Sequence, residues 1–232
     1  MTNEQPLELA IRRGIMEGTL PPDSRLKMED LKVRFDAGFS PIREALSKLV
    51  GEGLVELEVN RGFRVTPLTR EDLEDIAAAR RAVEIEALRL SMLNGDDRWE
   101  AGLVSAMHFY RLRAATAFDA PENLKLWEEA HDGLHAAMIG ACGSARLLQM
   151  QRQLQDQHLR YRRLIVIPEV SDDAHVEEHE RLVALVLERD IQGSLEHLTR
   201  HLLITVDALQ SARFWEREAI YAGDQPRSKQ KI

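Results

Sequence analysis

The stretch Ser40-Pro41-Ile42-Arg43-Glu44-Ala45-Leu46-Ser47-Lys48-Leu49 decides how the first part of this 232-residue chain is interpreted. Its apolar residues recur at the spacing of one helical face, which predicts a helix over residues 40–51. We expect Ser40 to cap this helix and Pro41 to occupy its first position, because the N–H that proline lacks has no helical partner there. Arg43 would then project from the first turn of the helix.

Two further helical patterns lie on the N-terminal side of this stretch. Residues 7–18 and 28–35 both carry apolar residues at helical spacing, and the turn-forming run Pro21-Pro22-Asp23-Ser24 separates them. Asp36-Ala37-Gly38 makes a tight connection to the next helix. Two short helices joined by such a turn are typical of a helix-turn-helix.

On the C-terminal side the periodicity changes from helical to alternating. Residues 54–59 alternate between apolar and polar side chains, Asn60-Arg61-Gly62 forms a turn, and residues 63–65 alternate back. This pattern predicts a β-hairpin with glycine in its turn. We therefore predict that residues 1–66 form a winged helix-turn-helix and that residues 67–70 are a linker.

A winged helix-turn-helix presents candidate DNA contacts on its second helix and on its wing. Arg43 lies in the helical turn that enters a major groove, where a guanidinium can bind guanine O6 and N7 or phosphates. Alternatively, Arg43 is a solvated residue or forms an ion pair with Glu44 or Glu52. The candidate DNA-binding residues are Lys27, Ser40, Arg43, Ser47, Lys48, Arg61, Gly62 and Arg64.

The charge of the chain limits how it can bind DNA. Its net charge is −8, and residues 1–66 hold 10 Lys and Arg against 11 Asp and Glu. Only residues 25–48 are locally basic, with six basic and four acidic side chains. Because duplex affinity comes largely from neutralised phosphates, we expect a focused patch that a homodimer doubles.

The overall composition excludes several other classes of protein. Aromatic residues make up 5%, too few for a stacking surface that binds single-stranded nucleic acid. Cys142 is the single cysteine, so no disulfide framework can form within the chain. No apolar run is long enough for a membrane span and the N-terminus is polar and acidic, so we expect a cytoplasmic protein without a membrane partner.

After Arg70 the sequence shows helical periodicity and no strand pattern. We predict a mainly α fold in which residues 71–213 form an all-α bundle of about six helices and residues 214–232 form a polar tail. The predicted helices span residues 71–93, 98–117, 121–140, 144–167, 171–189 and 190–213.

The eight histidines lie in this second part, and six of them form pairs four residues apart. Two histidines at this spacing share one helical face and can offer two nitrogens to one metal ion. Each histidine taken alone is as well explained by a surface or structural role, and six cannot all bind one ion. The pairs are His131 with His135, His175 with His179, and His197 with His201.

The sequence resembles the GntR superfamily of bacterial regulators, whose recognition helix carries the Pro-Ile-Arg-Glu-Ala-Leu run found here at residues 41–46. The run Arg61-Gly62-Phe63-Arg64-Val65 is similar to the wing of that family. Phe39 departs from the pattern, because the family usually has a basic residue there. The resemblance implies DNA binding and suggests an altered operator preference.

Residues 70–213 look like the helical ligand-sensing (FCD) domain of the FadR-type branch, on the signatures Ala79-Arg80-Arg81-Ala82-Val83-Glu84, Gly133-Leu134-His135 and Glu178-His179-Glu180-Arg181-Leu182. Many members of that branch hold a divalent metal with an aspartate and three histidines. The matching residues are His131, in place of the aspartate, and His135, His179 and His201. Four histidines would favour zinc, or nickel, over a harder ion.

The same resemblance implies a small acid as effector. Arg80 and the Arg160-Tyr161-Arg162-Arg163 cluster could bind its carboxylate; alternatively, the cluster is a solvated or ion-paired basic face. We name Arg80, Arg160 and Tyr161 as effector residues. The runs Gly38-Phe39-Ser40-Pro41, Ala141-Cys142-Gly143-Ser144 and Arg160-Tyr161-Arg162 resemble those of the carbon-starvation subgroup that represses glutarate catabolism. This resemblance implies a repressor controlled by a dicarboxylate. Two other hypotheses are a regulator that senses the metal itself and a metalloenzyme that uses the histidines.

Overall fold

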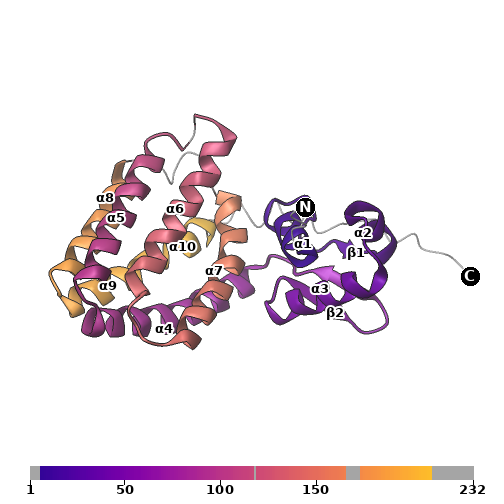
Figure 1. The fold of residues 1–232 in the computed structure, drawn as a ribbon, viewed down its shortest axis with the longest axis horizontal. Helices are drawn as coiled ribbons and strands as arrows, with labels where there is room; N and C mark the ends of the chain where they lie inside the picture. Colours follow the sequence, from indigo (N-terminus) through magenta and orange to yellow (C-terminus); the bar gives the residue numbers. More distant parts are fainter. Residues whose placement is uncertain (1–5, 118, 166–172, 211–232) are drawn as a thin grey trace, which may run out of the picture. The chain divides into compact units, whose positions relative to one another are not determined.

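A computed structural model describes residues 6–117, 119–165 and 173–210. The chain divides into two compact units, one built on the residues up to Leu73 and the other on Glu74–Val206. The fold is mainly α, as predicted (Figure 1). None of the helices in the described ranges is long and apolar enough to cross a membrane.

The first unit is a winged helix-turn-helix. Its helices and strands in chain order are α1 (Leu7–Met16), β1 (Arg25–Leu26), α2 (Met28–Phe35), α3 (Phe39–Gly51), β2 (Val55–Glu58) and β3 (Gly62–Val65). The apolar faces that predicted the helices meet in one core, where Ile11, Ile42 and Leu46 are fully buried. This core fixes the orientation of α3 and leaves its opposite face exposed.

The wing is a three-stranded antiparallel sheet in the order β1-β3-β2. Val55 pairs with Val65, Leu57 with Phe63 and Glu58 with Gly62. The hairpin was predicted, but its turn lies one residue earlier than expected, because Gly62 is already paired in the second strand of the hairpin. Gly62 begins β3 with a φ of +88°, a conformation that favours glycine. The sequence did not predict β1, because two residues are too few to show an alternating pattern.

The start of α3 corrects one sequence prediction. Gly38 rather than Ser40 is the N-cap residue, and Pro41 is the third helical residue rather than the first. The first turn of a helix lacks internal N–H partners throughout, so proline fits at any of its early positions. The run Ser40-Pro41 therefore predicts where the first turn of α3 lies but not which residue begins the helix.

The second unit is an all-α bundle. Within the described ranges it contains seven helices rather than six, because the predicted helix 190–213 is interrupted at Leu202 and Leu203. Residues 166–172, parts of two predicted helices, and the predicted tail 214–232 lie outside the described residues. The helices are α4 (Arg70–Asn94), α5 (Asp97–Ala114), α6 (Pro121–Ile139), α7 (Ala145–Ile165), α8 (Asp173–Leu187), α9 (Ile191–His201) and α10 (Ile204–Gln210).

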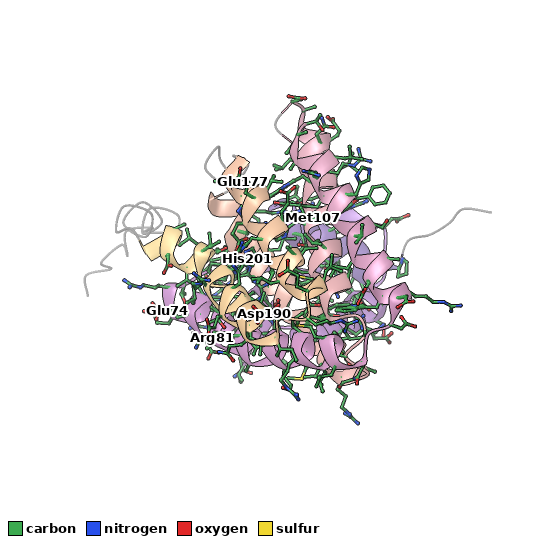
Figure 2. The ribbon with its side chains drawn as sticks, turned by 90° about the vertical axis from the view of Figure 1, so that its left-hand side faces the viewer. Glu74, Arg81, Met107, Glu177, Asp190 and His201 are labelled. Carbon is green, nitrogen blue, oxygen red and sulfur yellow. The ribbon has the colours of Figure 1, made fainter. Side chains whose placement is uncertain are left out.

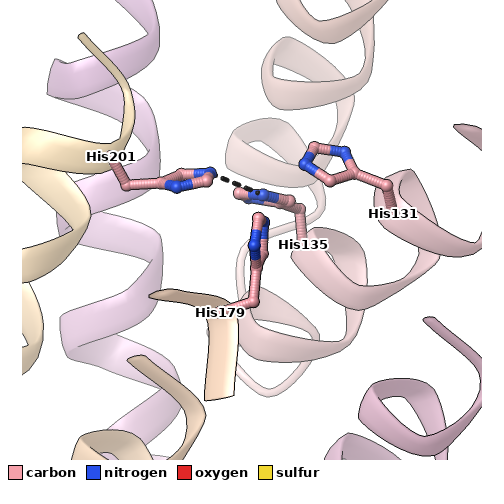
Figure 3. A group of neighbouring side chains, drawn as sticks. All are labelled: His131, His135, His179 and His201. Atoms are coloured by element: carbon pink, nitrogen blue, oxygen red, sulfur yellow. Dashed lines mark hydrogen bonds between the residues drawn. The ribbon is translucent and has the colours of Figure 1, made fainter. Parts of the chain in front are cut away.

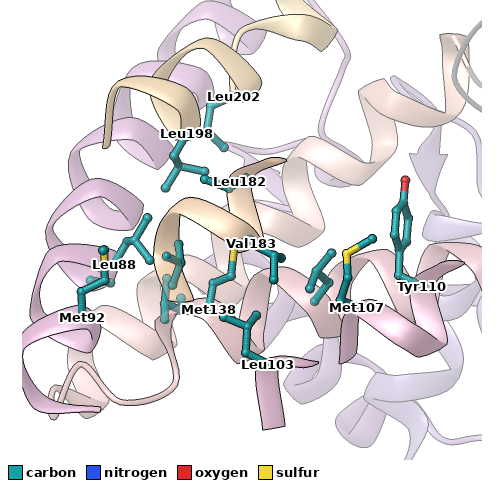
Figure 4. Close-up of a cluster of buried hydrophobic side chains, with 14 of the residues drawn as sticks. Leu88, Met92, Leu103, Met107, Tyr110, Met138, Leu182, Val183, Leu198 and Leu202 are labelled. Atoms are coloured by element: carbon teal, nitrogen blue, oxygen red, sulfur yellow. The ribbon is translucent and has the colours of Figure 1, made fainter. Parts of the chain in front are cut away.

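Apolar side chains from α4, α5, α6, α8 and α9 fill the centre of this bundle. Leu88, Leu103, Leu182 and Leu198 meet there in one buried cluster (Figure 4). The outer face is charged, as Arg81 on α4 illustrates, whereas His201 lies among the inner side chains (Figure 2). The bundle thus places polar side chains of several helices in a buried environment.

Candidate DNA interface and metal centre

The exposed face of α3 carries the sequence-predicted base-reading residues. Arg43 and Ser47 are exposed on the side opposite Ile42 and Leu46, and Ser40 is exposed in the first turn. Among the described residues, no carboxylate lies within ion-pair distance of Arg43. Glu52, one of its suggested partners, forms an ion pair with Arg12 instead. Arg43 is therefore sterically available to a ligand of this face.

The wing residues divide into two groups. Arg61 and Gly62 are exposed at the turn of the hairpin. Arg64, by contrast, is half-buried and forms ion pairs with Asp23, at 2.5 Å, and with Glu58. The charge of Arg64 is thus neutralised within the domain, which the sequence could not indicate because Asp23 lies 41 residues away.

Two lysines complete the candidate surface. Lys27 is exposed directly before α2. Lys48 lies 3.0 Å from a carboxylate oxygen of Glu8, but its side chain remains 68% exposed. Lys32 was not predicted, and its ammonium lies over the ring of Phe39, 5.1 Å from the centroid. A basic charge from α2 therefore lies beside the position where the resemblance expected one on α3.

In the second unit, four buried histidines from three helices converge (Figure 3). His131 and His135 come from α6, His179 from α8, and His201 ends α9. One ring nitrogen of each lies within 4.8 Å of the corresponding nitrogens of the others. The structure thus brings together the four residues named from the sequence.

Hydrogen bonds to neighbouring oxygen atoms orient two of these rings, and a carboxylate faces a third. The Nδ1 of His201 lies 2.8 Å from Glu178 Oε2, and the Nδ1 of His179 lies 2.8 Å from the carbonyl oxygen of His175. The Nδ1 of His135 faces Glu84 Oε2 at 3.8 Å. Such partners set the tautomer of a ligating histidine and direct its Nε2 toward the ion.

Burial favours the neutral form of three rings of the cluster. It lowers the pKa of His131, His179 and His201 well below 6.5, and neighbouring charges lower each further, Arg162 for His131 and another ring of the cluster for the other two. For Glu84, burial would raise the pKa, but the Arg80 charge and then His135 outweigh it and lower the pKa to about 2. Neutral imidazoles beside a fixed carboxylate are suited to binding a cation.

Two observations test whether a metal ion fits this cluster. The Nε2 atoms of His135 and His201 face each other at 3.0 Å. Two nitrogens on a tetrahedral ion with ordinary zinc–nitrogen bonds would be about 3.3 Å apart. In addition, Nε2 of His179 is buried without a hydrogen-bond partner. An unpartnered buried nitrogen is costly unless it binds something, so the donor set fits a divalent ion.

A small cavity of about 30 Å³ adjoins the cluster. Besides histidines of the cluster, Arg80 of α4 and Arg162 of α7 line it. Arg160 and Tyr161, named as effector residues, are buried but are not among the residues that line this cavity. Arg162 takes their place, because a residue two positions further along a helix points about 200° away.

His158 also lines the cavity and was not named from the sequence. Both of its ring nitrogens are buried without a hydrogen-bond partner. Its position four residues before Arg162 on α7 was a signal that the two share one helical face. His175 lines the cavity as well, whereas His197 contacts Glu178 at 2.9 Å.

A winged helix-turn-helix joined to a helical domain with a buried polar site defines the class of two-domain DNA-binding regulators. Residues 4–65 match the family model "Bacterial regulatory proteins, gntR family", and residues 75–203 match the FCD domain. The chain belongs to the GntR family and carries an FCD domain; it is a transcription regulator and not an enzyme.

Individual relatives agree with this assignment. The chain is 40% identical to the HTH-type transcriptional regulator BphR of Paraburkholderia xenovorans (strain LB400), over 86% of this chain and 82% of the relative. It is 36% identical to the HTH-type transcriptional repressor GlaR of Escherichia coli (strain K12), over 87% and 93%. A GntR regulator from Rhodococcus sp. RHA1 shares the fold with a TM-score of 0.71 at 20% identity, over 89% of this chain and 96% of its own.

Proposed function

We propose that this protein is a homodimeric repressor that releases its operator when a small carboxylic acid binds beside a metal ion in the FCD domain. The observation that carries the proposal is one cavity lined by imidazoles of the histidine cluster and by the guanidinium groups of Arg80 and Arg162. Guanidinium groups bind carboxylates by paired hydrogen bonds. The similarity to GlaR, a transcriptional repressor, supports repression by this chain as well.

The metal centre of this proposal uses histidines from α6, α8 and α9. An all-nitrogen donor set favours zinc, with nickel as the second candidate. The bound ion would supply a Lewis-acidic position for one carboxylate oxygen. Glu178 holds the ring of His201 by a contact of 2.8 Å, and the carboxylate of Glu84 faces the ring of His135 at 3.8 Å.

The acid is proposed to be a dicarboxylate such as glutarate. Arg162 is buried and is held by Asp132, whose Oδ1 lies 3.1 Å from both Nη atoms. Arg80 is likewise held by Glu84, with Nε 2.7 Å from Oε1. Because both guanidinium groups are already paired with a carboxylate, the acid would bind to their remaining N–H groups and to the ion. Groups held in place in this way lose little conformational entropy on binding.

On the DNA side, Arg43 is proposed to read the major groove and Arg61 and Gly62 to contact the backbone or minor groove. Lys27, Lys48, Ser40 and Ser47 would contact phosphates. A protein with operator DNA as its partner acts in the cytoplasm of a bacterium. Acid binding would shift the population of dimers away from the conformation that matches both half-sites.

Fluorescence anisotropy with a labelled fragment of the DNA upstream of the gene tests this proposal. With zinc present, glutarate or a related diacid should weaken operator binding at least tenfold. Removing zinc with a chelator should abolish this response. No specific binding at low salt would contradict the operator, and no response to any small acid would contradict the effector.

A regulator that senses the metal itself is the second candidate, favoured by the histidine cluster taken alone. The same titration separates the two functions. If chelation changes operator affinity and no acid does, the ion is the signal.

A further inference from the structure

The four histidines of the cluster are not chemically equivalent. In His179 and His201, Nδ1 lies 2.8 Å from an oxygen atom, of the His175 backbone and of Glu178. In His135, Nδ1 faces the buried Glu84 carboxylate at 3.8 Å, which is longer than a hydrogen bond, so here the carboxylate acts through its charge. An oxygen acceptor draws the ring proton to Nδ1. The Nε2 of each of these rings therefore keeps a free lone pair, which is what a metal ligand needs.

His131 has the opposite arrangement. Its Nδ1 lies 2.7 Å from Nη1 of Arg162. Because a guanidinium can only donate hydrogen bonds, Nδ1 of His131 must accept, and the proton of the neutral ring lies on Nε2. The far nitrogen of this ring points toward the other three histidines (Figure 3).

Asp132 could in principle reverse this tautomer by accepting a proton from Nδ1 of His131. However, its Oδ1 lies 3.4 Å from that nitrogen, beyond ordinary hydrogen-bond length. The same oxygen already accepts from both Nη atoms of Arg162 at 3.1 Å and from Gln155 Nε2 at 2.8 Å. Arg162 is therefore the stronger influence on His131.

We propose that the ion is held by His135, His179 and His201, and that His131 is not a ligand but donates its Nε2–H to a carboxylate oxygen bound at the ion. Arg162 positions this donor by fixing the tautomer. The assignment rests on the proposed metal-dependent function and changes the expectation of four histidine ligands. It also explains how an acid can bind, because three protein ligands leave a tetrahedral zinc open whereas four would close it.

Zinc affinity, measured by competition with a chromophoric chelator on the full-length protein, tests the ligand set. We expect His131→Ala to bind zinc within about threefold of the unsubstituted protein. Loss of a ligand in His135→Ala, His179→Ala or His201→Ala should weaken zinc binding by about a hundredfold or more. His108→Ala, an exposed histidine on α5, is the matched control, and circular dichroism checks that each variant is folded.

Arg162→Met provides a test that a merely structural role for His131 would not satisfy. Without the guanidinium, His131 can place its proton on Nδ1 beside Asp132 and offer Nε2 to the ion. Zinc affinity should then increase, and the double variant Arg162→Met/His131→Ala should lose the part of the increase that needs His131.

The donor role is tested with acetate, the simplest carboxylate, on the cobalt-loaded protein. Acetate binding should change the visible absorption of cobalt, and His131→Ala should weaken it about tenfold, as expected for one hydrogen bond to a charged group. Unchanged acetate affinity would overturn the donor role. A loss of zinc in His131→Ala as large as in His135→Ala would overturn the ligand assignment, whereas an unsubstituted protein that binds no zinc would overturn the metal centre itself.

Discussion

Arg43 projects from the exposed side of α3, while the opposite side of the helix is packed into the core. A guanidinium in this place can discriminate bases without stabilising the fold. Arg43→Ala should therefore weaken specific operator binding by about 1–3 kcal/mol, or roughly 5- to 150-fold, and leave the free energy of unfolding unchanged.

Arg13→Ala is the matched control for this prediction. Arg13 is an exposed arginine of the same unit, on α1 rather than on α3. Competition titrations with mutated operators would show whether Arg43 reads bases or only neutralises charge. Equal losses in Arg13→Ala and Arg43→Ala would contradict base reading by Arg43.

The buried histidines predict how stability depends on pH. Burial first, and then nearby positive charges, lower the pKa of His158 well below 6.5. In the unfolded chain this histidine binds a proton below about pH 6.5, while in the folded chain it does not. Below that pH the unfolded state binds more protons than the folded state. The free energy of unfolding is therefore highest above about pH 6.5 and falls as the pH decreases.

We expect the metal-free protein to lose up to about 1.4 kcal/mol per pH unit for each such histidine as the pH falls below about 6.5. Urea unfolding in the presence of a chelator, at several values between about pH 7.5 and about pH 5, measures this slope. His158→Leu removes the contribution of one histidine to this slope and should therefore make the slope shallower. An unchanged slope would mean that His158 binds protons equally in the folded and unfolded protein.

At the scale of helices and strands, the wing depends on backbone conformation at Gly62. Its φ of +88° favours glycine, and a Cβ there would meet nothing within 4 Å. The cost of Gly62→Ala is therefore confined to the backbone, about 1 kcal/mol of unfolding free energy. Because Arg61 precedes this residue in the turn, operator affinity should fall as well.

Gly51→Ala provides the comparison, since Gly51 ends α3 without a positive φ and a Cβ there would also meet nothing within 4 Å. Alanine favours helix over glycine, so this substitution should be neutral or stabilising by up to about 1 kcal/mol. Thermal unfolding of both variants distinguishes them. A Gly62→Ala protein as stable as Gly51→Ala would show that the wing turn adapts without strain.

Elements with a local pattern could be predicted from the sequence, and features made by tertiary contact could not. Periodicity within one segment indicated α1, α2, α3 and the β2–β3 hairpin. By contrast, β1 exists only because it pairs with β3, and the break between α9 and α10 interrupts a pattern that reads as one helix. Local periodicity carries no information about such partners.

The same distinction holds for the site. The family resemblance named the four histidines that the bundle brings together. The choice of Arg162 over Arg160, the cavity-lining position of His158 and the neutralisation of Arg64 by Asp23 all depend on the packing of distant helices or strands. Which groups of a basic cluster face inward could be settled only once the rotation of α7 was known.

At the scale of the whole molecule, charge limits how DNA is bound. With a net charge of −8, the chain has little general attraction for a polyanion. A single winged helix-turn-helix with so few basic side chains available to phosphates would bind weakly at physiological salt. Specific binding should therefore require two winged helix-turn-helix domains on one operator, which a homodimer supplies.

This requirement predicts a strict dependence on the spacing of the operator half-sites. Inserting about five base pairs between them should reduce affinity to that of a single half-site, because the second half-site then faces the opposite side of the duplex. Inserting about ten base pairs returns both half-sites to the same side of the duplex and should recover part of the affinity. Light scattering of the free protein, with anisotropy on the three operators, measures both parts of the prediction. Equal affinity for the parent operator and the five-base-pair insertion would show that each chain binds DNA independently.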